Sequence, residues 1–117
     1  MLRFWKATLN TRNGLVFAFR SEQAFREEIA ALALSLPLAW LIGATTMRRV
    51  ELIAAVVLVL VIELLNTAIE KLADRLTRDH DPQIGQVKDM GSAAVGVALV
   101  MAGLFWLFAI AERIGLV

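Results

Sequence analysis

The sequence predicts an all-α membrane protein with an N-terminal amphipathic surface helix and three transmembrane helices. Hydrophobic residues make up 59% of its 117 residues, against about 45–50% in an ordinary soluble domain. The charged residues, 20% of the chain, are kept apart from long apolar stretches. The absence of cysteine excludes a disulfide scaffold and a thiolate metal site. A net charge of +1 gives no support to a nucleic-acid partner. We therefore expect one small domain, residues 1–117.

Residues 1–20 have the pattern of one amphipathic helix, or of two short ones, in the plane of the membrane interface. Basic residues separate apolar residues that recur at helical spacings. These apolar residues are Leu2, Trp5, Leu9, Val16 and Phe19. The Asn13-Gly14 pair predicts a break within this segment. Ser21 is expected to cap a second helix, which starts at Glu22 and continues into the first span.

Three long apolar runs predict transmembrane spans at residues 29–47, 52–70 and 90–111. The first and third runs contain no charged residue, and each exceeds the roughly 18 residues that mark a spanning helix. The second run contains a single charge, Glu63, up to Ile69, and Glu70 ends it. Pro37 lies inside the first span, where a transmembrane helix tolerates it.

The distribution of lysine and arginine orients these spans. Most of the basic residues lie before the first span or between the second and third, which share one side of the membrane. They are Arg3, Lys6, Arg12, Arg20, Arg26, Lys71, Arg75, Arg78 and Lys88. The other side carries only Arg48, Arg49 and Arg113. We therefore expect a cytoplasmic N-terminus and a periplasmic C-terminus, in the inner membrane if the source is a bacterium.

The helix of the third span is expected to begin before the membrane. Asp81 followed by Pro82 is a typical helix start, with Asp as the cap and Pro at the first helical position. Ala94, Ala98 and Ala102 form a stripe of small residues, which lets helices approach closely in lipid. The stripe by itself would also fit a structural or pore-forming oligomer of three-span subunits.

Three polar residues of the second span share one helix face. Glu63, Asn66 and Glu70 are spaced at i, i+3 and i+7. An ionisable residue within a span is costly and should face the bundle interior or a wet cavity, so it indicates a functional site. Alternatively, Glu63 pairs with a basic residue to fix packing, and Asn66 forms an interhelical hydrogen bond. A proton-coupled transporter could also use Glu63, although it would need an aqueous path across the bilayer.

Further charged residues collect where the three helices meet the predicted cytoplasmic face. They are Glu22, Glu27, Glu28, Glu70, Asp74, Lys88 and Asp89. Carboxylates at this density repel one another unless a cation or a proton intervenes. Oxygen ligands with a phosphate partner suit Mg²⁺, and a lysine suits a phosphate as a point charge. A multi-histidine metal site is excluded because His80 is the only histidine, and no P-loop motif is present.

Three motifs together resemble those of the prokaryotic diacylglycerol kinases, in the family's order and spacing. Residues 63–70, ELLNTAIE, followed by Asp74, resemble the family's central signature. Residues 22–28, EQAFREE, are similar to the segment before its first span. Residues 88–94, KDMGSAA, are similar to the entrance of its third helix.

The resemblance implies a homotrimeric membrane lipid kinase that transfers the γ-phosphoryl group of MgATP to diacylglycerol and gives phosphatidic acid. It implies that Glu63 is the general base, that Asn66 orients the site around it, and that Glu22 and Glu70 hold Mg²⁺. The residues that it assigns to the nucleotide and its metal are Arg3, Glu22, Glu70, Asp79, His80, Asp81, Lys88 and Asp89. Those that it assigns to the lipid are Ala24, Phe25, Arg26, Glu27, Glu28, Glu63 and Ser92.

Undecaprenol kinases share the central motif, so undecaprenol is the nearest alternative substrate. Residues 22–28 look more like the diacylglycerol enzymes, which favours diacylglycerol.

Overall fold

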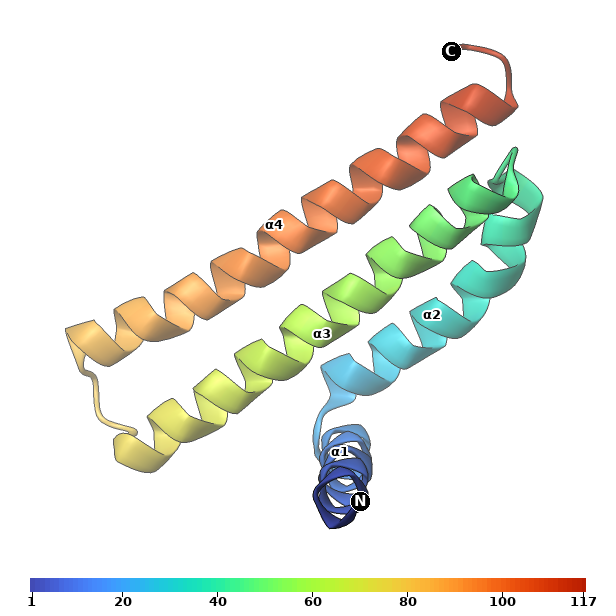
Figure 1. The fold of residues 1–117 in the computed structure, drawn as a ribbon. Coiled ribbons are helices and arrows are strands. Elements are labelled where there is room, and N and C mark those ends of the chain that lie inside the picture. The colour runs from blue at the N-terminus through green and yellow to red at the C-terminus, as the bar shows by residue number, and fades with distance from the viewer.

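The computed structural model describes all 117 residues. It contains four α-helices and no strand (Figure 1). The helices are α1 (Leu2–Ser21), α2 (Gln23–Ile42), α3 (Thr46–Leu76) and α4 (Pro82–Arg113). α3 lies between α2 and α4, which run alongside it, whereas α1 crosses the bundle and is seen end on. The all-helical expectation is confirmed, and the predicted surface helix is a separate helix with its own direction.

α1 is one continuous helix, so the break predicted at Asn13-Gly14 is wrong. The packing demands no special backbone there, because a Cβ placed at Gly14 would meet no atom within 4 Å. The helix continues to Ser21, which therefore ends α1 instead of capping α2. Glu22 takes the cap position with an extended backbone (φ −122°, ψ 113°), and its side chain forms no capping hydrogen bond. The Glu22 carboxylate is thus available for contacts elsewhere.

α2 ends at Ile42, so the first predicted span, residues 29–47, is wrong at its C-terminal end. The backbone of Gly43 leaves the helix (φ −67°, ψ 121°). A Cβ there would lie 2.9 Å from the Ala39 carbonyl oxygen, so the tight exit requires glycine. Thr45 then caps α3, because its Oγ1 accepts a hydrogen bond of 3.1 Å from the Arg48 N–H. The last two residues of the predicted span therefore belong to α3.

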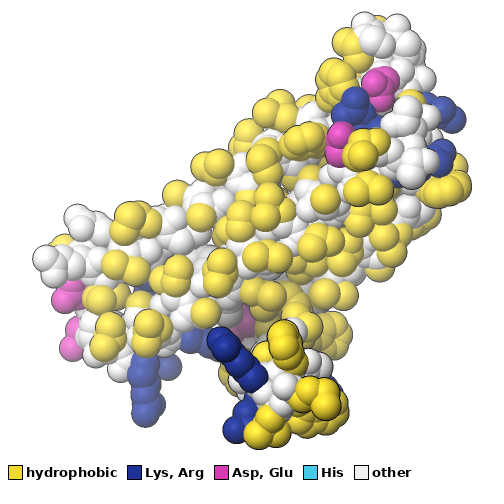
Figure 2. Space-filling view, in the orientation of Figure 1, with side chains coloured by type: hydrophobic (Ala, Val, Ile, Leu, Met, Phe, Trp, Pro, Cys, Tyr) yellow, Lys and Arg dark blue, Asp and Glu magenta, His cyan; other side chains and the backbone are white.

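α3 and α4 are each long and apolar enough to cross a membrane. α2 is not among the helices that are long and apolar enough to cross a membrane. Its first turns carry Arg26, Glu27 and Glu28, so its uncharged part is only residues 29–42. The third span therefore stays a prediction. Hydrophobic side chains cover the length of the bundle in Figure 2, whereas charged ones gather at its ends and around α1. Since only 15 of the 117 residues are buried, this apolar surface is suited to lipid or to a further subunit.

Small residues bring α3 and α4 into close contact, as the predicted stripe requires. Ala98 and Ala102 of α4 pack on Ala55 and Val59 of α3 in one buried cluster. Ala94, the first residue of the stripe, remains exposed. The two buried alanines set the register of α4 along α3.

The start of α4 agrees with the prediction. Asp81 Oδ1 accepts hydrogen bonds from the Gln83 N–H (2.9 Å) and the Ile84 N–H (3.2 Å), and Pro82 is the first helical residue. The connection from α3 is consequently short, at residues 77–81. It returns the first turns of α4 directly to the end of α3.

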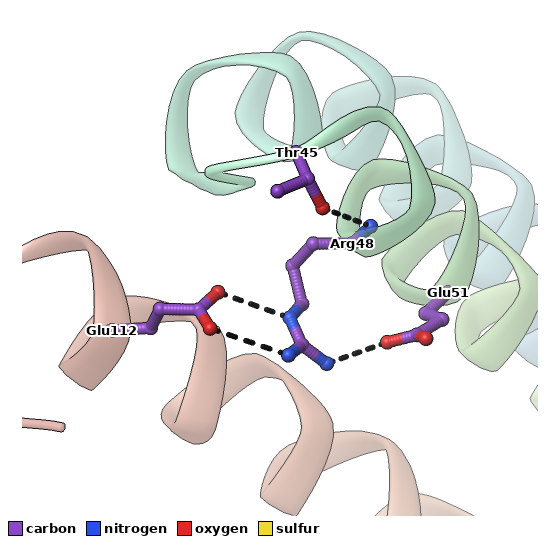
Figure 3. Close-up of polar contacts among 4 residues, drawn as sticks. All are labelled: Thr45, Arg48, Glu51 and Glu112. Carbon is purple, nitrogen blue, oxygen red and sulfur yellow. Dashed lines mark hydrogen bonds and ion pairs between the residues drawn. The ribbon is translucent and has the colours of Figure 1, made fainter.

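An ion-pair network around Arg48 joins α3 and α4 at the opposite end of the bundle (Figure 3). Its Nε and Nη2 donate to Glu112 Oε1 and Oε2 at 3.1 and 3.3 Å, and its Nη1 donates to Glu51 Oε2 at 2.6 Å. The guanidinium carbon also lies 4.8 Å from the centroid of the Phe108 ring. One arginine thus connects the two longest helices far from the residues predicted to carry chemistry.

Candidate active site

The predicted polar face of α3 contains one hydrogen bond between its own members. Glu63, Asn66 and Glu70 lie on the uninterrupted helix Thr46–Leu76, which gives them the predicted common side. Asn66 is buried, and its Nδ2 donates to Glu70 Oε1 at 3.3 Å. Its Oδ1 is also buried but has no hydrogen-bond partner. The amide therefore orients one carboxylate and leaves one oxygen available.

Gly91 of α4 packs directly on this amide. A Cβ at residue 91 would overlap Asn66 Oδ1, so only glycine permits the observed approach. Gly91 is itself buried. The contact places residues 88–94, one of the three motifs, against residues 63–70, another of them.

A second contact between the same motifs joins Asp74 of α3 to Lys88 of α4. Lys88 Nζ donates to Asp74 Oδ1 at 2.5 Å, and both side chains are partly exposed. This hydrogen bond and the charge of Lys88 hold the pKa of Asp74 below its ordinary value. The predicted phosphate-binding lysine is thereby fixed at the exposed end of α3.

Lys71 is a site residue that the sequence reasoning missed. Its Nζ lies 2.8 Å from Glu22 Oε1 and 5.2 Å from the centroid of the Phe17 ring. Lys71 is the first basic residue after the apolar run of α3. In the sequence it indicates only the orientation of the spans. No sequence pattern could pair it with Glu22, because the pairing depends on how the junction of α1 and α2 packs on α3.

Several carboxylates of α2 and α3 lie within electrostatic reach of one another. The charges of Glu70 and Glu22 act on Glu63, which in turn acts on Glu28. Burial raises the pKa of Glu28 to about 7, and the neighbouring Glu63 and Glu27 add to this rise. One oxygen of Glu28, Oε2, is buried without a hydrogen-bond partner. A cation or a proton at this place would relieve the repulsion.

Some residues predicted to contact lipid also have structural contacts. Phe25 is buried with Ala18 of α1 and Leu60 of α3. Arg26 Nη1 donates to the carbonyl oxygens at the end of α1, of Phe19 at 2.8 Å and Arg20 at 3.2 Å. The segment before the first span therefore fixes the angle between α1 and α2. Ala24 and Glu27 of the same segment are exposed.

The other predicted residues lie at the margins of this group. Arg3 is exposed near the start of α1 and forms no hydrogen bond or ion pair. Asp79 and His80 lie exposed between α3 and α4, where Asp81 caps the latter. Asp89 and Ser92 are exposed on the first turns of α4. By contrast, Asn66 bonds Glu70, and the charges of Glu70 and Glu22 act on Glu63.

Two hollows meet at Lys71, the ion-pair partner of Glu22. An apolar cavity of about 450 Å³ lies between α1 and α3, with Leu15, Phe17 and Leu64 among its lining residues. An open polar cleft of about 580 Å³ follows the end of α3 and is lined by no hydrophobic residue. Lys71 lines both of them. An apolar ligand and a charged ligand could therefore approach Lys71 from adjacent sides.

The donor atoms fit a magnesium ion that also binds phosphate. No group of three or more carboxylate or histidine side chains is close enough to hold a metal ion by itself. Mg²⁺ commonly uses one or two protein carboxylates and completes its shell with phosphate oxygens and water. Glu22 and Glu70, whose charges both act on Glu63, offer two such carboxylates, and the unpartnered Oδ1 of Asn66 is a further oxygen on the side chain that contacts Glu70.

Comparison with known proteins finds relatives in one family. A family model described as prokaryotic diacylglycerol kinase matches residues 10–110. A diacylglycerol kinase of Escherichia coli strain K12 is 39% identical over 104 residues, which cover 89% of this chain and 85% of the relative. Diacylglycerol kinases of Haemophilus influenzae and Pseudomonas aeruginosa are 37% and 38% identical, over 86% and 89% of this chain and 85% of each relative.

Proposed function

The chain belongs to the prokaryotic diacylglycerol kinase family, and from that premise we propose that it phosphorylates 1,2-diacylglycerol with ATP, giving phosphatidic acid and ADP. The enzyme is an ATP-dependent phosphotransferase of the membrane, as its family and its two long apolar helices indicate. The finer assignments below rest on the arrangement of its side chains.

The observation that carries the proposal is the contact of Gly91 with Asn66. It brings Lys88 and the entrance of α4 beside the carboxylates of α3. Phosphoryl transfer needs mainly positioning and neutralisation of charge. A rigid contact between the two segments supplies positioning, and a lysine with a magnesium ion supplies the positive charge.

Glu63 is proposed as the general base. Its carboxylate takes the proton of the lipid hydroxyl as that oxygen forms a bond to the γ-phosphorus, while the bond from the γ-phosphorus to the β-bridging oxygen breaks and ADP leaves. Glu63 is only partly exposed and lies within the second span, about 10 Å further into the membrane than Glu70 by the helical rise. Such a depth suits a hydroxyl at the level of the lipid headgroups.

Glu22 and Glu70 are proposed to hold the magnesium ion. A magnesium ion held by these two carboxylates would supply positive charge that offsets the charge of the ATP phosphates. Asn66 keeps Glu70 oriented through its Nδ2. The nucleotide is expected in the polar cleft at the end of α3, which Asp79 lines and which Lys88 adjoins through its ion pair with Asp74. Further contacts to the nucleotide are proposed for Asp89, His80, Asp81 and Arg3.

The lipid is proposed to enter from the side of α1. The apolar cavity between α1 and α3 would take an acyl chain and direct the hydroxyl towards Glu63. Phe25 shapes this entrance by joining α1, α2 and α3. The residues proposed to line the remainder of the lipid path are Ala24, Arg26, Glu27, Glu28 and Ser92.

The proposed setting is the bacterial inner membrane, with α2 as the third spanning helix and the N-terminus in the cytoplasm. The excess of basic residues on that side supports the orientation. We further propose a homotrimer whose subunits share active sites. The exposed apolar side chains along α4, such as Val97, Leu104 and Leu107, provide a surface for lipid and partner subunits.

Phosphate transfer from radiolabelled MgATP in mixed micelles tests the function, with diacylglycerol and undecaprenol offered separately. Label is expected in phosphatidic acid. Label only in undecaprenyl phosphate would replace the substrate and keep the kinase chemistry. No label in either lipid, from folded oligomeric protein, would reject the proposal and turn attention to a transporter or a structural role.

The base assignment needs a carboxylate control on the same helix. Glu63→Gln is expected to lower kcat by about 10²- to 10⁴-fold without changing the oligomer. Glu51→Gln also removes one carboxylate charge from α3 but lies at the far end of the helix, on the Arg48 network, and is expected to retain activity. Near-normal turnover of Glu63→Gln would show that another group takes the proton.

A further inference from the structure

One of the two proposed metal ligands is already paired with a cation from the chain itself. Lys71 Nζ lies 2.8 Å from Glu22 Oε1, and the two side chains are 45% and 31% exposed. The Glu22 carboxylate forms no hydrogen bond that caps α2. The carboxylate that is proposed to bind a divalent cation therefore binds an ammonium group in this structure.

Lys71 is held at this place by two independent contacts. Besides the Glu22 carboxylate, the face of the Phe17 ring attracts the ammonium group at 5.2 Å. Lys71 also lines both the apolar cavity and the polar cleft. It thus lies at the boundary between the proposed lipid and nucleotide sides, with a second resting place on Phe17 when it leaves Glu22.

We propose that Lys71 is a positioning residue that holds the Glu22 carboxylate in the metal-free site and competes with the divalent cation for it. This inference rests on the proposed metal role of Glu22. Lys71 keeps the carboxylate in place and compensates its charge until the cation arrives, and then moves towards Phe17. The lysine therefore sets the cation concentration at which the site fills.

The competition can be measured without catalysis. Purified full-length protein in detergent micelles is titrated with Mn²⁺ in the absence of nucleotide, and free Mn²⁺ is followed by electron paramagnetic resonance. Because the pair is partly solvated, Lys71→Met is expected to tighten Mn²⁺ binding by about threefold to fivefold. Lys71→Arg, which keeps the charge, is expected to bind Mn²⁺ close to wild type. Lys71→Gln replaces Lys71→Met if the latter does not assemble.

Arg75→Gln is the matched control for loss of charge. Arg75 lies one turn further along α3 and forms no ion pair, so its loss is expected to leave Mn²⁺ affinity near wild type. Binding to Lys71→Met no tighter than to wild type, undetectable binding to both included, overturns the proposal. Equal tightening by Arg75→Gln also overturns it, because general electrostatics would then explain the effect.

The failure of the proposed function would look different. If Glu22→Gln leaves Mn²⁺ affinity unchanged, Glu22 is not a metal ligand and the premise itself is wrong. If Glu22→Gln weakens Mn²⁺ binding while Lys71→Met does not strengthen it, the metal role stands and the role of Lys71 falls. A fall in half-saturating Mg²⁺ for Lys71→Met is the corresponding kinetic result.

Discussion

Gly91 and Asn66 are in contact so close that a methyl group on residue 91 would overlap the amide oxygen of residue 66. The buried Asn66 side chain also donates to Glu70. Through Asn66, Gly91 of α4 therefore controls the position of Glu70, a proposed metal ligand on α3.

Gly91→Ala is expected to lower kcat by tenfold or more, on the order of the loss seen when a supporting contact is removed. The added Cβ pushes the Asn66 amide away and releases Glu70. Gly96→Ala, on the same helix with nothing within 4 Å of its Cβ position, is the matched control and is expected to keep its activity. Equal activity of the two variants in the micelle assay would contradict this role of the contact.

Removal of the Asn66 donor is expected to raise the Mg²⁺ requirement. In Asn66→Ala, Glu70 loses its hydrogen bond and half-saturating Mg²⁺ should rise by about tenfold. Glu70→Gln, which removes a proposed ligand, should raise it at least as much. Mg²⁺ titrations of initial rate check both, with Glu51→Gln as the control. An unchanged Mg²⁺ requirement in Glu70→Gln would remove Glu70 from the metal site.

Exchange of the Asp74–Lys88 pair separates packing from catalysis. Asp74→Lys and Lys88→Asp should each lower the thermal unfolding midpoint by a few degrees, because like charges then face each other at the contact. The double variant restores an ion pair and should regain the midpoint. It should remain poorly active, because the cation is then on α3 and no longer where Lys88 is proposed to meet phosphate. Recovery of full activity would mean that Lys88 serves only packing.

The stability of the protein should depend on pH through Glu28. Its pKa is raised to about 7 by burial, with Glu63 and Glu27 adding to the rise. A carboxyl group with a raised folded-state pKa favours the folded state below its ordinary pKa near 4.5, and this contribution is lost as pH rises through about 7. Glu28→Gln should therefore match wild type at pH 5 and melt at a higher temperature at pH 8. The exposed neighbour Glu27→Gln is the control and should show a smaller change between the two pH values.

The Arg48 network should contribute to stability and not to turnover. Arg48→Met leaves the Glu112 and Glu51 carboxylates without their partner (Figure 3), so the unfolding midpoint should fall by several degrees. Turnover at 25 °C should stay near wild type, since the network is at the opposite end of α3. Arg113→Gln, an exposed arginine without an ion pair, is the control for charge. A large loss of kcat without a loss of stability would disprove this division.

The sequence by itself determined the two longest helices, α3 and α4, and the polar face of α3. Apolar runs predicted α3 and α4, the Asp81-Pro82 start of α4 was correct, and helical spacing put Glu63, Asn66 and Glu70 on one side. These features depend on interactions within a few residues, which a linear pattern records. The Asn13-Gly14 break failed because nothing in the packing at Gly14 requires a turn.

Only the tertiary structure decided which side chains of different helices meet. The contacts of Gly91 with Asn66, Lys88 with Asp74 and Lys71 with Glu22 depend on the register and angle between helices. Buried alanines and the Arg48 network on α3 and α4 set that register. The periodicity of one helix carries no information about its neighbour's rotation, so the sequence could place Lys71 on α3 but could not pair it with Glu22.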